Sequence, residues 1–181
     1  MSTIQTLAVF CGSKKGKNPS YESTTRKLAA MLVKNDIGVV YGGGNVGLMG
    51  VLADEMVQLG GKITGVIPEK LQARELGHGT ITELIVVETM HQRKAKMAEM
   101  ADAFVALPGG IGTLEEIVEV FTWLQLGYHH KQCALLDADG FYTGLIQFLN
   151  HTVQEGFLDQ STLENLIIEK EPEVLIGKLI N

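Results

Sequence analysis

The sequence has only two cysteines, Cys11 and Cys133, and their spacing is not that of a metal site. A cysteine-rich scaffold held together by disulfides or by zinc is therefore excluded. Each cysteine lies in an apolar segment of strand length, so we expect both to be reduced and buried small hydrophobes. This use of cysteine predicts a cytoplasmic protein.

Long apolar runs and an excess of positive charge are also absent. No segment approaches the roughly 20 apolar residues of a membrane span, and we expect no membrane partner. The first residues, MSTIQTLAVFCGSKKG, carry no basic stretch ahead of their short apolar run, which predicts a first strand rather than a signal peptide. The formal net charge of −6 disfavours nucleic acid polymers as partners but is compatible with a local pocket for one small anion.

Apolar strand-length segments alternate with longer helical patterns through the 181 residues, and 45% of these residues are hydrophobic. The alternation predicts an α/β fold: a doubly wound, Rossmann-like parallel sheet with helices on both faces, in a single domain over residues 1–181. The expected strands are Thr6–Cys11, Gly38–Tyr41, Lys62–Ile67, Glu83–Val87, Ala103–Leu107, Cys133–Leu136 and Leu166–Ile168. The expected helices are Ser20–Lys34, Gly47–Leu59, Met90–Ala101, Thr113–Leu126, Tyr142–Glu155 and a short one after Pro172.

Ligands of such sheets bind at the carboxyl ends of the strands, so the turns there carry the functional prediction. The turn YGGGNVGLMG after the second strand formally fits the dinucleotide pattern G-x-G-x-x-G. That pattern normally follows the first strand and needs an acidic residue at the end of the next one, where Val66-Ile67-Pro68 stands instead. Tight packing of a strand on a helix, or close approach to a phosphate or sugar at Gly43 and Gly44, explains the turn better.

A second glycine-rich turn, Pro108–Glu116, follows the fifth expected strand and reads PGGIGTLEE. Its glycines let successive backbone N–H groups converge on an anion, and a helix starting near Thr113 adds its positive end. The turn lacks the lysine of a P-loop, so it predicts a site for a monophosphate rather than for triphosphate transfer.

Glu116 has two interpretations at this stage. Thr113-x-x-Glu116 fits a capping box, and the pattern alone favours that structural role. The same carboxylate would also lie within reach of a sugar whose phosphate is bound by the turn. For the neighbouring Glu115 and for Glu119 we expect solvation or interaction with the helix dipole.

The segment Thr89–Met97 opens the helix before the second turn. Arg93 shares the apolar side of this helix with Met97, four residues later, so it reaches either the edge of the core or the site. Lys96 is expected to be solvated. The histidines, among them His91, have no metal-ligand spacing, and no metal is expected.

MHQRK at residues 90–94 followed by PGGIGTLEE resembles the cytokinin-activating phosphoribohydrolases known as the LOG (Lonely Guy) family. The similarity extends from AVFCGS at residues 8–13 through YGGGNVGLMG and TWLQLGYHHK to DGFY and EGF near residues 139–157. It implies hydrolysis of nucleoside 5′-monophosphates, including AMP and N6-prenyl-AMP, to free base and ribose 5-phosphate. It also implies a homodimer and no cofactor.

The resemblance also implies roles for individual residues. The catalytic pair falls on Arg93 and Glu116. Substrate-binding positions fall on Glu75, Lys94, Gly110, Ile111, Gly112, Thr113, Leu114, Glu115 and Thr122, to which the strand-end turns add Ser13, Gly43 and Gly44. Lys14, where many relatives have a small residue, either assists phosphate binding or is solvated.

The expected mechanism assigns water activation and stabilisation of an oxocarbenium-like sugar to Glu116. Arg93 would hold the phosphate or ribose and balance charge, and Glu75 would lie near the base. Two other functions stay open. One is a nucleotide-binding or sensing module without turnover. The other is a pyridoxal-phosphate decarboxylase, after an old label of the family, although the chain is short for it and shows no Schiff-base lysine context.

Overall fold

A seven-stranded parallel sheet forms the centre of the computed structural model, which describes residues 4–75 and 77–180, with the backbone alone at residues 73–75. Its strands are β1 (Thr6–Phe10), β2 (Gly38–Tyr41), β3 (Ile63–Pro68), β4 (Glu83–Val87), β5 (Ala103–Ala106), β6 (Gln132–Leu136) and β7 (Leu166–Glu169). Their order is β4-β3-β2-β1-β5-β6-β7, and each neighbouring pair is parallel. The winding direction reverses between β1 and β5, which is where a sheet of this type opens a crevice for ligands.

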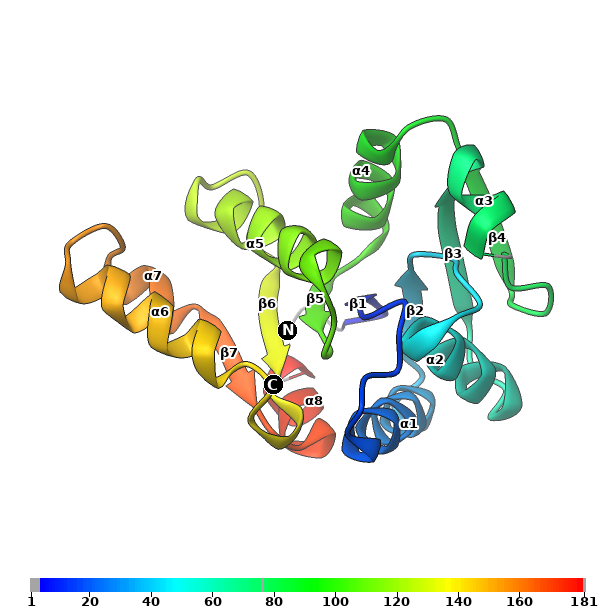
Figure 1. Cartoon of the computed structure of the whole chain (residues 1–181), viewed down its shortest axis with the longest axis horizontal. Helices are drawn as coiled ribbons and strands as arrows, with labels where there is room; N and C mark the ends of the chain where they lie inside the picture. The colour runs from blue at the N-terminus through cyan, green and yellow to red at the C-terminus, as the bar shows by residue number, and fades with distance from the viewer. Residues whose placement is uncertain (1–3, 76, 181) are drawn as a thin grey trace.

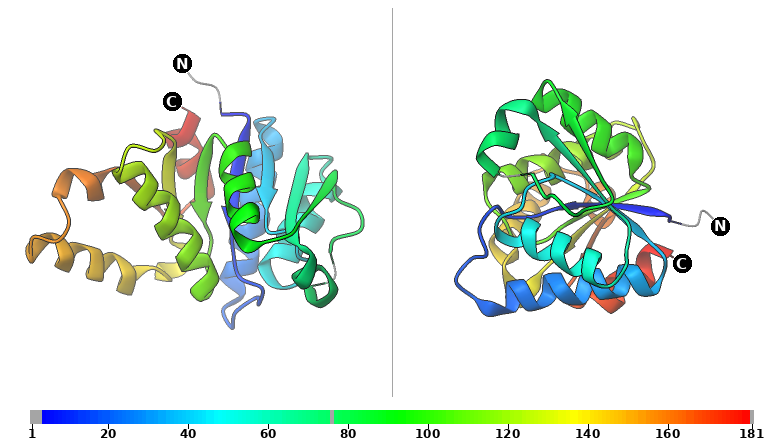
Figure 2. Two further views of the ribbon diagram at one scale, coloured as in Figure 1. Left: turned by 90° about the horizontal axis from the view of Figure 1, so that it is seen from above. Right: turned by 90° about the vertical axis from the view of Figure 1, so that its right-hand side faces the viewer.

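Helices cover both faces of the sheet (Figures 1 and 2). One layer contains α1 (Pro19–Lys34), α2 (Gly47–Gln58) and α8 (Pro172–Ile180). The other layer contains α4 (Met90–Met100), α5 (Ile111–Gln125), α6 (Thr143–Gln154) and the short α7 (Gln160–Glu164). The short α3 (Glu69–Glu75) follows β3, and a single 3₁₀ turn, η1 (Ala138–Gly140), follows β6. The doubly wound fold is thereby confirmed.

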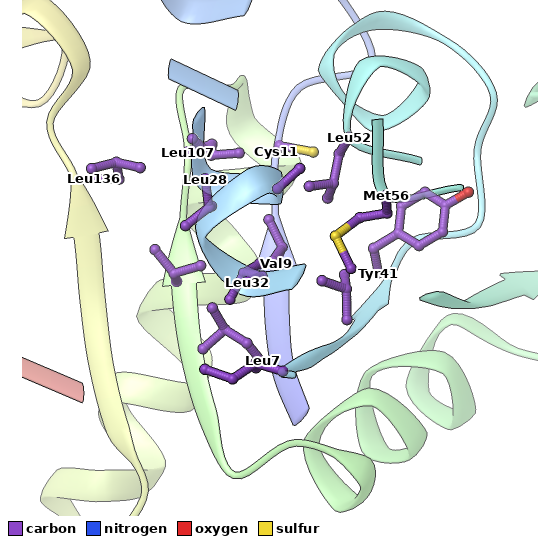
Figure 3. Packing of buried hydrophobic residues seen from close by; sticks show 14 of the residues in the cluster. Leu7, Val9, Cys11, Leu28, Leu32, Tyr41, Leu52, Met56, Leu107 and Leu136 are labelled. Atoms are coloured by element: carbon purple, nitrogen blue, oxygen red, sulfur yellow. The ribbon is translucent and has the colours of Figure 1, made fainter. Parts of the chain in front are cut away.

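The alternation of side chains along β1 divides the core into two clusters, one under each helical layer. Leu7 and Val9 pack toward α1, α2 and α8, while Ala8 and Phe10 pack toward α4 and α5. Figure 3 shows the first cluster, in which the Tyr41 ring lies beside the strands with no exposed surface. Both faces of β1 are covered, which explains why its sequence is apolar from Leu7 to Phe10.

All seven expected strands are confirmed, each end within one residue. Of the helices, α5 differs most, because it begins at Ile111 rather than near Thr113. Three short elements, α3, η1 and α7, are not indicated by the sequence pattern, because they have seven, three and five residues and lack a sustained apolar stripe. Among the described residues, no helix combines the length and apolar character that crossing a bilayer would require.

Candidate active site

A pocket of about 210 Å³ lies at the carboxyl ends of the central strands and gathers much of the predicted site. We call it the Arg93–Glu116 pocket, after its two charged residues. Its wall is built from the turn after β1, the start of α2, the buried side of α4 and the first turns of α5. The lining residues are Cys11, Gly12, Ser13, Met49, Arg93, Gly110, Ile111, Gly112, Thr113 and Glu116.

The start of α4 fixes the position of Arg93. Thr89 and Gln92 form a capping box: the Gln92 N–H donates to Thr89 Oγ1 at 3.1 Å and the Thr89 N–H donates to Gln92 Oε1 at 3.2 Å. The helix then presents Arg93 and Met97 as its two buried residues. The predicted shared face is confirmed, and it directs Arg93 inward at the strand ends.

The Arg93 side chain is only 10% exposed, and its guanidinium is contacted on several sides. Its Nε donates to the Val66 carbonyl oxygen at 3.1 Å, and Nη1 lies 3.4 Å from the sulfur of Met90. A Cβ built on Gly42 would lie 2.0 Å from Arg93 Nη2. The glycine at 42 therefore leaves the space in which this buried cation sits.

Glu116 faces Arg93 from α5. Nη2 of Arg93 lies 3.6 Å from Oε1 of Glu116, an ion pair too long for a strong hydrogen bond. Burial is the largest influence on the Glu116 carboxyl and raises its pKa, and the nearby Arg93 cation opposes that shift only in part. Burial also raises the pKa of the Cys11 thiol, with a smaller contribution from Glu116, so this cysteine is a neutral wall residue rather than a nucleophile.

The start of α5 is uncapped and faces the pocket. Gly110 is the N-cap, with extended backbone (φ −97°, ψ −155°) and no side chain to accept from the first helical N–H groups. Thr113 is thus the third residue of the helix, and the interpretation of Thr113-x-x-Glu116 as a capping box is wrong. Thr113 packs on Gly109, where a Cβ would lie 2.1 Å from the hydroxyl oxygen. Orphan N–H groups and the positive end of the helix dipole are left for an anion.

Lys94 does not line this pocket and belongs to an ion-pair cluster. Its Nζ lies 2.5 Å from Glu115 and 3.0 Å from Glu119, and both carboxylates raise its pKa. Glu115 is exposed, as expected for a solvated residue, but the ion pairs that both glutamates form with Lys94 were not predicted. Thr122 is exposed farther along α5 and donates to the Val118 carbonyl oxygen at 2.7 Å.

The other predicted binding residues are distributed around the site. Ser13 lines the Arg93–Glu116 pocket, whereas Leu114 lines a neighbouring apolar hollow beside α6. Gly43 and Gly44 are buried and lie outside the pocket lining. Glu75 ends α3, and its side chain lies outside the described residues.

Three lining residues were not predicted: Cys11, Gly12 and Met49. Gly12 could have been found from the sequence, since it is a glycine directly after the first expected strand. In the structure a Cβ there would lie 3.2 Å from Gly109 Cα. Its absent side chain lets the turns after β1 and β5 approach each other. Cys11 and Met49 carried no such signal, because they differ from other buried apolar residues only in where the fold places them.

Known proteins resemble this chain along most of its length. Residues 49–179 match the sequence profile of a family described as "Possible lysine decarboxylase". A cytokinin riboside 5′-monophosphate phosphoribohydrolase of Arabidopsis thaliana is 46% identical over 98% of this chain and 82% of its own length. A probable enzyme of the same name from Oryza sativa subsp. japonica is 44% identical over 98% of this chain and 71% of its own.

Solved structures share the fold at much lower sequence identity. The molybdenum cofactor carrier protein of Chlamydomonas reinhardtii superposes with a TM-score of 0.73 at 16% identity, covering 96% of this chain and 94% of that one. The molybdenum cofactor binding protein of Rippkaea orientalis gives 0.73 at 20% identity, with coverage of 100% and 99%. At such low identity a shared fold does not establish a shared function. The sequence relatives do establish the family. This chain belongs to the LOG family, whose sequence profile bears the lysine decarboxylase description.

Proposed function

We propose that this protein hydrolyses the N-glycosidic bond of nucleoside 5′-monophosphates, releasing the free base and ribose 5-phosphate. AMP and N6-prenyl-AMP are the proposed substrates, in line with relatives named for cytokinin riboside 5′-monophosphates. One observation carries the proposal: a buried Arg93–Glu116 pair stands beside an uncapped, glycine-bordered helix start. An anion site and a buried carboxylate adjoin in one pocket, as phosphate-anchored glycosidic hydrolysis requires.

The pocket supports a division of labour between binding and chemistry. The N–H groups of Ile111 to Thr113 hold the 5′-phosphate, so that binding energy far from the bond positions the anomeric carbon. As the bond to the base breaks, positive charge grows on the ribose ring. The Glu116 carboxylate stabilises that charge and takes a proton from the attacking water.

Burial prepares Glu116 for the second task. A carboxylate with a raised pKa is a stronger base than an exposed one, and the Arg93 cation limits the rise by partly opposing the effect of burial. Arg93 has N–H donors beyond the one facing Glu116, and we assign them to the phosphate or a ribose hydroxyl. Glu75, at the end of α3, is proposed to bind near the base.

Turnover of AMP by purified variants tests this assignment. Glu116→Gln and Arg93→Ala should each lower kcat/KM by about 100-fold or more, equivalent to ~3 kcal/mol of transition-state stabilisation. Arg93→Lys serves as a second variant, because it retains a buried cation. The control is Glu99→Gln, which alters a 72% exposed carboxylate on α4 and should retain wild-type turnover.

The same assay separates the competing functions. AMP binding without release of adenine by the wild-type protein would indicate a binding module. Amine formation from lysine would indicate the decarboxylase of the family description. In the described residues, no lysine lines the Arg93–Glu116 pocket, which favours hydrolysis over Schiff-base chemistry there.

A homodimer is proposed as the working form. Ile111 and Val118 of α5 and its C-cap, Leu126, are spaced by seven and eight residues, lie on one side of the helix, and are 82%, 44% and 64% exposed. Such an apolar stripe is typical of a surface that another subunit covers. Thr122 lies on this face, so a second copy would bring it to the subunit boundary, where the binding role implied by the resemblance becomes possible.

Sedimentation of two matched variants tests the dimer. Val118→Lys should convert a dimer to a monomer, whereas Val174→Lys on α8, where the side chain is 47% exposed on the other layer, should leave it intact. A monomeric wild-type protein would refute the dimer. We further propose that residues 1–181 act as one hydrolase domain in the cytoplasm, which is supported by two buried, unpaired cysteines.

A further inference from the structure

A second pocket, of about 350 Å³, adjoins the Arg93–Glu116 pocket and has no role in the hydrolysis described above. We call it the switch-point pocket, because it lies after β1 and β5, where the strand order reverses. The two pockets share Gly12, Ser13 and Gly110. A phosphate held at the start of α5 would therefore stand at their junction.

The switch-point pocket has walls that the fold builds and braces. The Tyr21 ring of α1 meets Phe141, which follows η1, edge to face, with ring centroids 5.5 Å apart. The side-chain amide of Asn18 donates to the Asp139 carboxylate and so joins the same two elements. Gly16 (φ +75°) makes room for the Tyr21 ring, since a Cβ there would lie 2.7 Å from it. Leu48 and Pro108 complete a largely apolar wall.

Two cations border this apolar wall on the side of the turn after β1. Lys15 is paired with Glu22, its Nζ 2.9 Å from the carboxylate. Lys14 also lines the pocket, and within the described part of the chain no acidic group lies within ion-pair distance of it. An available ammonium next to the junction of the pockets suits a second phosphate, and the aromatic walls beyond it suit a planar ring.

We propose that the switch-point pocket binds the part of a nucleotide that lies beyond the 5′-phosphate, so that dinucleoside diphosphates span both pockets. One nucleoside lies against Arg93 and Glu116, the pyrophosphate crosses Gly110 toward Lys14, and the second base contacts Phe141. The proposal rests on the proposed function for the placement of the first nucleoside. It adds a ligand class that the hydrolysis of monophosphates does not require.

Calorimetric titration of AMP, ADP and diadenosine diphosphate tests the proposal. The titrations use a Glu116→Gln background, in which the ligands are not consumed. ADP should bind more tightly than AMP, and Lys14→Ala should remove that gain. Diadenosine diphosphate should bind about tenfold more tightly than ADP, as expected for one base on an aromatic wall.

Variants of the aromatic wall decide where the second base lies. Phe141→Ala should bring the dinucleotide affinity within about twofold of the ADP affinity and leave AMP affinity unchanged, and Phe141→Leu should retain part of the gain, as loss of a stacking contact predicts. Phe157→Ala, at an 86% exposed position, should have no effect.

The proposal is overturned if the dinucleotide binds no more tightly than AMP, or if its advantage survives in Phe141→Ala. Release of adenine from AMP by the unsubstituted protein is scored separately. A protein that binds the dinucleotide through Phe141 but releases no adenine contradicts the hydrolase and leaves the second pocket established. Adenine release from AMP without tighter binding of the dinucleotide supports the hydrolase and overturns the role proposed for the second pocket.

Discussion

The glycine-rich turn after β2 is filled by the protein's own atoms, whereas much of the glycine-rich turn after β5 is open. A Cβ at Gly42 would meet Arg93 Nη2 at 2.0 Å, and one at Gly47 would meet the carbonyl carbon of Ser13 at 2.2 Å. At Gly110 and Gly112 a Cβ would meet nothing within 4 Å. The first turn thus uses glycine to bring structural parts together, and the second uses it to leave space for a ligand.

Arg93 and Glu116 connect these two turns. The guanidinium occupies the space above Gly42, and the carboxylate projects from the helix that begins after Gly110. Packing around the first turn therefore determines where the cation stands relative to the anion site of the second. A methyl group added at Gly42 should lower stability and one added at Gly112 should raise it, while both should impair turnover of AMP.

The largest effect is expected from Gly42→Ala. The new methyl group displaces the buried guanidinium and separates it from Glu116, so kcat/KM for AMP should fall by about 100-fold and the Tm should fall as well. Initial rates and thermal unfolding measure both. Gly144→Ala on α6 is the control, because a Cβ there meets nothing within 4 Å. Unchanged turnover in Gly42→Ala would show that the first turn does not position Arg93.

A smaller effect is expected from Gly112→Ala, which should increase stability but weaken the binding of AMP. Alanine favours the helix, so the free energy of unfolding should increase by up to about 1 kcal/mol. The methyl group enters the anion site, so KM for AMP should rise about tenfold. Gly144→Ala again provides the control, since it occupies the same second helical position in α6 and should show only the gain in stability. Equal KM values for AMP in the two variants would show that the phosphate does not bind at this turn.

The smallest effect is a dependence of stability on pH through Glu116. Burial raises its pKa in the folded protein, so the folded state binds more protons than the unfolded state between the two pKa values. Stability from this group is complete below the ordinary glutamate pKa and is lost as pH rises through the folded pKa. The Tm of Glu116→Gln relative to wild type should therefore increase as the pH rises above the ordinary glutamate pKa of about 4.3. A constant difference would mean that the carboxyl has an ordinary pKa.

The central strands were predictable because they are buried on both faces and therefore apolar along most of their length. The edge strand β4 is only partly buried but still has an apolar run after Glu83. Helix ends were less predictable. Nothing in PGGIGT showed that Gly110 would take extended backbone and start α5 two residues before Thr113. The true capping box, Thr89-x-x-Gln92, was visible as a pattern but was not recognised.

The site was predictable where sequence spacing determined it. The position of Arg93 on the buried side of a helix that begins at a strand end was readable from the spacing. Glu116 was placed in the site only by the family resemblance, because the spacing alone favoured a capping box. The binding of Lys94 by Glu115 and Glu119 joins residues 21 and 25 positions apart, and only the packing of α4 beside α5 brings them together. The sequence also could not show that Gly42 makes room for Arg93 while Gly112 borders open space, since both are glycines in glycine-rich turns.

A crystal structure of Glu116→Gln with AMP tests the central claim most directly. The account predicts the 5′-phosphate within hydrogen-bonding distance of the N–H groups of Ile111 to Thr113. It also predicts the anomeric carbon beside residue 116, with no more than one water molecule between them. A phosphate bound away from the start of α5, or a ribose turned away from residue 116, would contradict it.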